Sequence, residues 1–155
     1  MTFERHPLAK ERKSSSIVLV KALLQEHSGL LDNHRQEFVR LALWKVTEAE
    51  GIHKLRTKFM SEAALSVVES EPRPSRNTEL RHEHVFERVK MASKLIKANP
   101  DSAKDILKDA IGCTVTKDEH DRLNMIKNCD GWQRYREAGI RVWDTEKNTP
   151  VNYPA

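Results

Sequence analysis

The sequence predicts a mainly helical fold with a small β component, that is, an α+β domain. In this arrangement a helical hairpin is followed by a strand–helix–strand–helix segment. Apolar residues recur at helical spacing through residues 17–24 and 38–46, whereas segments that suit short strands, such as 113–116 and 140–143, follow later in the chain. With 155 residues, of which 38% are hydrophobic and 32% charged, the chain suits one compact domain with a lean core and a highly charged surface.

The N-terminal part is expected to be a helical subdomain over residues 14–70, preceded by a flexible polar arm over residues 1–13. Hydroxyl groups in Ser14–Ser16 are suited to cap a helix that Gly29 ends. Asn33 begins a second helix, because a glutamine follows it at capping-box spacing. Each helix carries one apolar stripe, so the two are expected to pack as a hairpin.

A change of pattern follows the second helix. Residues 52–60 alternate basic and apolar side chains, which predicts a short strand. Ser61 is suited to cap a short helix after that strand. Residues 71–78 contain two prolines among polar residues, and such a composition cannot continue a helix. This segment is therefore predicted to be the linker to the C-terminal part.

The C-terminal part, residues 79–144, is expected to mix short strands and helices before a polar tail over residues 145–155. The expected elements are a strand over 80–86, a helix ending at Asn99, a second helix ending at Gly112, a strand over 113–116, a helix through Ile126, a short helix between Asp130 and Gly139, and a strand over 140–143. We expect both parts to form one compact unit.

Charge and cysteine content narrow the functional classes. The net charge of +4 favours an anionic partner, of which nucleic acid is the commonest. Residues 1–70 and 71–155 each carry +2, so neither half is a basic arm. Two cysteines without a Cys-x-x-Cys pair suit a reducing compartment, and a cytoplasmic location is expected. The longest purely apolar run has four residues, so no membrane partner is expected.

Histidines near the middle of the chain are the strongest candidates for chemistry. His82, Glu83 and His84 lie in the first predicted strand of the C-terminal part, and His120 lies in the first turn of a later helix. Thr116 and Glu119 have capping-box spacing at the start of that helix. Histidine is the commonest transition-metal ligand and the usual general base near neutral pH. Two strands leading into a capped helix would bring these side chains together.

Residues 80–125 resemble the HNH, or ββα-metal, endonucleases. Glu83-His84-Val85 is similar to the acid–histidine–aliphatic run that ends the first strand of that family, and residues 113–123 look like its second strand and helix. The resemblance implies a nuclease that cuts DNA or RNA. His84 would be the general base, while Glu83 and His120 would hold one divalent ion, Mg²⁺ or Mn²⁺, with Zn²⁺ as the other candidate. The side chains implied to contact nucleic acid are Arg81, Arg88, Lys117 and Arg122.

Three departures from the family pattern leave alternatives open. The acid is Glu rather than Asp, two predicted helices separate the strands, and no cysteine pairs support a zinc finger. In an extended strand His82 and His84 share one face and Glu83 points to the other, so a metal set of His82, His84 and His120 is the alternative. A non-catalytic basic helical module also fits. It would bind nucleic acid, or dock on a protein–nucleic-acid complex as a phage-type inhibitor does. The wide apolar stripe on the second helix permits a homodimer.

Overall fold

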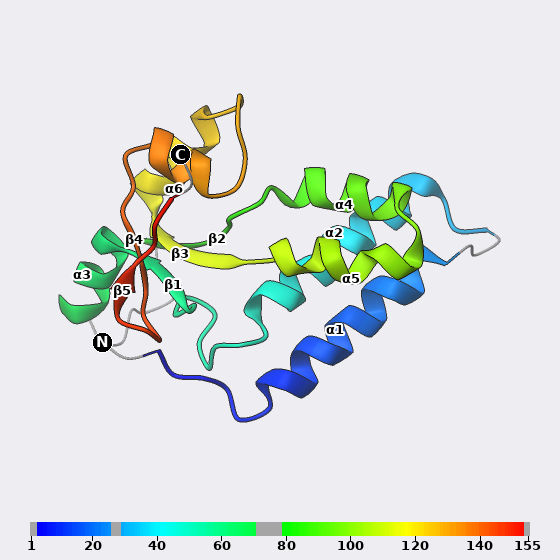
Figure 1. The fold of residues 1–155 in the computed structure, drawn as a ribbon, viewed down its shortest axis with the longest axis horizontal. Coiled ribbons are helices and arrows are strands. Elements are labelled where there is room, and N and C mark those ends of the chain that lie inside the picture. Colours follow the sequence, from blue (N-terminus) through cyan, green and yellow to red (C-terminus); the bar gives the residue numbers. More distant parts are fainter. Residues whose placement is uncertain (1–2, 26–28, 71–78, 154–155) are drawn as a thin grey trace.

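The fold, taken from a computed structural model that describes residues 3–25, 29–70 and 79–153, is α+β, as predicted. Figure 1 shows a block of helices beside a sheet that carries further helices. The helical block contains α1 (Ala9–Leu24), α2 (Asp32–Glu48), α4 (Arg88–Lys97) and α5 (Ala103–Ile106). Among the described residues, none of the helices has the length and apolar character needed to cross a lipid bilayer.

The predicted helical hairpin is formed by α1 and α2. Its buried seam is continuous with the inner face of α4, and the shared core comprises Val20, Val39, Ala42, Leu43, Val46, Met91, Ala92 and Leu95. The prediction that Ser14–Ser16 cap α1 is wrong, since the helix begins at Ala9. Within the helix, Ser16 Oγ donates a hydrogen bond to the carbonyl of Arg12 at 2.9 Å, which satisfies the hydroxyl without a cap. Residues 9–13 are therefore helical rather than part of an arm.

The sheet has five strands in the order β2–β3–β1–β4–β5. Its strands are β1 (Phe59–Ser61), β2 (Leu80–His84), β3 (Gly112–Thr116), β4 (Val142–Asp144) and β5 (Thr149–Pro150). The β1–β3 pair is parallel and the other pairs are antiparallel. The strand predicted over 52–60 is mostly wrong. The backbone turns there, with the Arg56 N–H donating to the His53 carbonyl at 3.0 Å, and pairing begins only at Phe59.

Two helix caps after the N-terminal hairpin were predicted correctly. Ser61 Oγ accepts the N–H of Ala64 at 3.1 Å, at the start of α3 (Glu62–Ser70). Thr116 and Glu119 form the predicted capping box at the start of α6 (Lys117–Met125). The last helix is α7 (Trp132–Glu137), where a helix was predicted.

The chain between β2 and β3 forms an excursion into the helical block (Figure 1). It contains α4 and then, in place of the second predicted helix, η1 (Pro100–Ser102), α5 and η2 (Leu107–Asp109). The two strands nevertheless pair in antiparallel register, with Glu83 opposite Cys113 and His84 opposite Gly112. Because α6 follows β3 directly, the local order is strand, strand, helix. The predicted linker, residues 71–78, lies outside the described residues.

Candidate functional site

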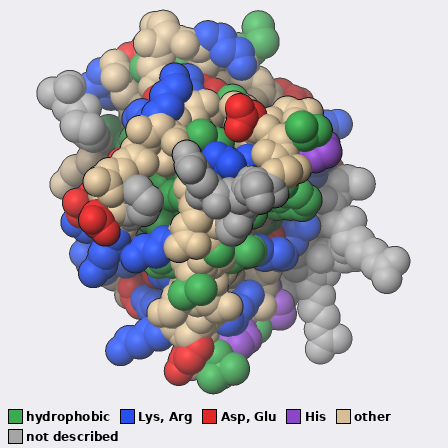
Figure 2. All heavy atoms as spheres, turned by 90° about the vertical axis from the view of Figure 1, so that its right-hand side faces the viewer, with side chains coloured by type: hydrophobic (Ala, Val, Ile, Leu, Met, Phe, Trp, Pro, Cys, Tyr) green, Lys and Arg blue, Asp and Glu red, His purple; other side chains and the backbone are tan. Residues whose placement is uncertain are grey.

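A cleft of about 700 Å³ opens where the helical block meets β2, α6 and α7. We call it the His–Glu cleft, since its lining includes His82, Glu83, His84 and His120. Basic side chains dominate its charge, because the described lining has two glutamates, Glu83 and Glu87, against the cations Lys54, Arg81, Arg88, Lys127 and Arg134. On the face of the molecule in Figure 2, by contrast, lysine and arginine side chains are scattered among acidic and apolar ones.

The pair Glu83–His120 is the closest contact between predicted site residues. Glu83 Oε2 lies 2.5 Å from His120 Nδ1, although 37 positions separate the two residues in the chain. Strand β2 supplies the carboxylate and the capped first turn of α6 supplies the imidazole. The Glu83 side chain is 11% exposed and the His120 side chain 33%, so the imidazole lies at the solvent side of the pair.

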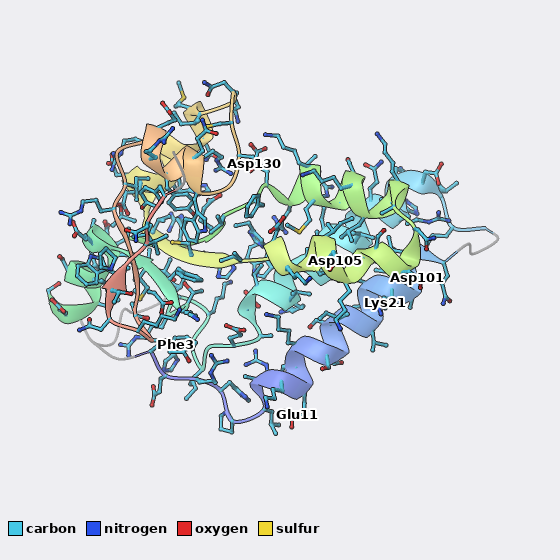
Figure 3. The ribbon with its side chains drawn as sticks, in the orientation of Figure 1. Phe3, Glu11, Lys21, Asp101, Asp105 and Asp130 are labelled. Carbon is cyan, nitrogen blue, oxygen red and sulfur yellow. The ribbon has the colours of Figure 1, made fainter. Side chains whose placement is uncertain are left out.

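Arg134, a buried residue of α7, holds the Glu83 carboxylate in place. This residue is only 2% exposed, and its Nη2 lies 3.3 Å from Glu83 Oε1. Its Nη1 is 4.0 Å from carboxylate oxygens of both Glu87 and Asp130. Asp130, labelled in Figure 3, accepts the backbone N–H groups of Gly131 at 2.9 Å and of Glu87 at 3.0 Å. A buried guanidinium surrounded by carboxylates fixes the orientation of Glu83, because removing either charge would leave the other uncompensated.

His82 and His84 lie on the opposite face of β2 and converge on α2. Their Nε2 atoms are 2.9 Å and 3.2 Å from the same hydroxyl oxygen, Thr47 Oγ1. Trp44 stacks on His82 with a centroid distance of 5.9 Å and meets His84 edge-on at 5.6 Å. Burial lowers the pKa of His82, and burial, His82 and Arg88 together lower the pKa of His84 to about 2. Both imidazoles are therefore neutral near pH 7.

Strand alternation explains which predicted residues meet. Since side chains of consecutive strand residues point to opposite faces, Glu83 reaches α6, whereas His82 and His84 reach α2. The alternative set of three histidines is not assembled, because His120 contacts Glu83 and lies across the strand from the other two. Thr47 and Arg134 belong to the site but were missed. Neither has a sequence signal, since their roles come from contacts with residues 35 to 51 positions away.

The divalent ion implied by the resemblance can be tested against this geometry. Adjacent ligands of an octahedral Mg²⁺ at about 2.1 Å lie about 3 Å apart, whereas Glu83 Oε2 and His120 Nδ1 are 2.5 Å apart. The other oxygen of Glu83 already faces Arg134. Within the described ranges, no group of three or more His, Cys, Asp or Glu side chains is placed to hold a metal ion. The pair as arranged is a hydrogen-bonded acid–imidazole pair, and the metal assignment stays a prediction.

The predicted nucleic-acid contacts divide into two groups. Arg81 and Arg88 line the His–Glu cleft, and Arg88 lies 4.5 Å from the ring centre of Trp44. Arg122 and Lys117 do not line it. Arg122 instead donates to the carbonyl of Ala138 at 2.6 Å. Two of the four predicted cations are thus in position to meet a ligand in the cleft.

A second hollow lies on the outer face of the helical hairpin. It measures about 420 Å³ and is lined by Leu19, Leu23, Phe38 and Leu41 among others. Phe38 and Leu41 are 48% and 58% exposed, so the stripe on α2 is wider than its buried seam. The homodimer expected from this stripe stays a prediction.

Comparison with known proteins leaves the site to be interpreted from its own geometry. Family models, curated proteins and solved structures were compared with the chain, and none matches it. Fold and site together define an α+β protein with a basic cleft built around a carboxylate–imidazole pair.

Proposed function

We propose that this protein binds nucleic acid in the His–Glu cleft and cleaves a phosphodiester bond there. The observation that carries the proposal is the contact between Glu83 and His120 at 2.5 Å on the wall of a basic cleft. A carboxylate that fixes one nitrogen of an imidazole leaves the other nitrogen oriented for proton transfer. Such a pair can act as a general base that removes a proton from a hydroxyl group or a water molecule.

The lining of the cleft favours a phosphate-containing substrate. Lys54, Arg81, Arg88 and Lys127 reach the cleft from the turn after α2, from β2, from the start of α4 and from the segment after α6, respectively. Cations on several sides of one cleft neutralise phosphates along a backbone and stabilise the charge that develops on a reacting phosphoryl group. The arrangement therefore supports both steps of the proposal, binding and cleavage.

A second candidate function is binding without cleavage. It is favoured by the state of His82 and His84, which are hydrogen-bonded to Thr47 and have lowered pKa values. Such imidazoles are uncharged at neutral pH and are already hydrogen-bonded within the protein. In this case the protein would be a basic module that docks on nucleic acid or on a protein–nucleic-acid complex.

The test combines a binding and a cleavage assay on the full chain. Fluorescence anisotropy with labelled RNA and DNA oligonucleotides, measured at increasing salt, is expected to show affinity that falls steeply with ionic strength. The same oligonucleotides and a supercoiled plasmid are then incubated with Mg²⁺, with Mn²⁺ or with EDTA. His120→Ala is the site variant. His34→Ala is the matched control, because His34 is an exposed residue near the start of α2.

Cleavage that His120→Ala abolishes and His34→Ala retains is the expected result. Binding with no cleavage of any substrate under any ion condition would replace the proposal by the second candidate. Affinity that does not change with salt would contradict both, because phosphate contacts release counterions.

A further inference from the structure

Three imidazoles border the His–Glu cleft, but only one has a proton-accepting nitrogen at the solvent side. Both ring nitrogens of His82 lie near protein oxygens, Nε2 at 2.9 Å from Thr47 Oγ1 and Nδ1 at 3.3 Å from the Lys54 carbonyl. His84 is 8% exposed and its Nε2 is directed at Thr47. The side chain of His120 is 33% exposed. Burial and the contact with Thr47 therefore keep the His84 imidazole from a substrate hydroxyl. Accessibility and hydrogen bonding therefore single out His120.

Hydrogen bonds fix which nitrogen of His120 carries the proton. The carboxylate of Glu83 can only accept, so the hydrogen lies on Nδ1. On the other side, the amide nitrogen of Asn124 lies 3.0 Å from His120 Nε2 and donates to it. Nε2 consequently carries a lone pair. Asn124 is exposed and one turn further along α6, so an incoming hydroxyl can replace it without uncovering a buried group.

The nucleophile follows from the same geometry. The pair as arranged does not fit a metal ion, and a water that no metal ion acidifies is a weaker acid that must also be positioned for attack. A substrate that holds its own hydroxyl next to the phosphorus removes that requirement, because an intramolecular nucleophile is already in place. RNA has such a group in its 2′-hydroxyl, and DNA lacks it.

We propose that the substrate is RNA and that the Glu83–His120 pair deprotonates its 2′-hydroxyl without a metal ion. This inference rests on the proposed function. His120 Nε2 takes the proton, and O2′ forms a bond to phosphorus. The P–O5′ bond breaks with its electron pair on O5′, which takes a proton from water. The hydroxide formed in this way takes the proton from His120 Nε2, which restores the neutral imidazole. The products are a 2′,3′-cyclic phosphate and a free 5′-hydroxyl. In this reaction Glu83 is a positioning residue, and the cations of the cleft stabilise the negative charge on the phosphoryl oxygens.

The experiment uses wild-type protein and three oligonucleotides of one sequence in EDTA: RNA, DNA and fully 2′-O-methylated RNA. The expected result is cleavage of RNA alone, with a 2′,3′-cyclic phosphate detected by mass spectrometry. His120→Ala is expected to lower the rate at least about 100-fold. Glu83→Gln is expected to lower kcat while KM changes less than about twofold, because Glu83 orients the base rather than binding RNA. His34→Ala is expected to match the wild type.

Two outcomes would overturn this inference, and they differ in what they leave standing. Cleavage of DNA and 2′-O-methyl RNA as well as RNA, dependent on Mg²⁺ or Mn²⁺, would refute the metal-free mechanism and keep the proposed function. No cleavage of any oligonucleotide, together with salt-dependent binding, would refute both. The comparison among substrates uses the wild-type chain, so it holds even where a variant fails to fold.

Discussion

Acid is expected to destabilise the protein through His84, and the structure sets the size of the effect. In the folded state the pKa of His84 is about 2, chiefly because of burial, against 6.5 for the ordinary residue. Below pH 6.5 the unfolded chain therefore binds a proton that the folded chain does not. The stabilisation is fully present above that pH and is lost progressively as the pH falls toward 2. From pH 7 to pH 5 the loss is about 2 kcal/mol.

The assay is urea unfolding, followed by circular dichroism at pH 7, 6 and 5, of the wild type and His84→Leu. Leucine keeps an apolar side chain against Trp44 but does not titrate, and Thr47 retains its bond to the Trp44 carbonyl at 2.9 Å. Other groups titrate alike in both proteins, so the two proteins are compared by how much their free energy of unfolding changes with pH. The wild type is expected to lose about 2 kcal/mol more than the variant over this range, whereas His34→Ala follows the wild type. Parallel stability curves for wild type and His84→Leu would show that burial does not lower the pKa of His84.

Further predictions concern the supports of the site. Arg134→Leu leaves Glu83 buried without its cation, and thermal and urea unfolding should show a loss of about 3–5 kcal/mol; an unchanged midpoint would contradict this. Ser61→Ala removes both the cap of α3 and the hydrogen bond to Glu119 at 2.5 Å, so about 1–2 kcal/mol should be lost in the same measurement. In ¹⁵N-resolved spectra of the imidazole groups, His120 should be protonated at Nδ1, and a dominant Nε2–H tautomer would disprove its bond to Glu83.

Local sequence signals correctly predicted features that depend only on neighbouring residues, such as helix caps. The capping box of Thr116 and Glu119 and the cap by Ser61 are present as expected, since each needs only residues within one helical turn. The strand predicted over 52–60 was mostly wrong, because alternation alone does not supply a partner strand. Only the end of that segment reaches β3 and β4, and pairing begins at Phe59.

Only those features of the site that follow from the local sequence pattern could be predicted. The sequence predicted that histidine and glutamate side chains form the site, and it predicted the strand–strand–helix order that brings them together. The division of β2 into two chemically different faces was foreseen as the result of an extended strand. What each face meets was not foreseeable, because Thr47 comes from α2 and Arg134 from α7. Those tertiary contacts leave His84 neutral and Glu83 anchored, and so decide which imidazole is accessible.

The most direct test of the Glu83–His120 pair as the chemical centre is the single-turnover rate of RNA cleavage in EDTA. It is measured for the wild type, His120→Ala and His34→Ala at saturating protein, so that differences in binding do not contribute. The rate for His120→Ala is expected to be at least about 100-fold below the other two. Equal rates for all three proteins would contradict this expectation.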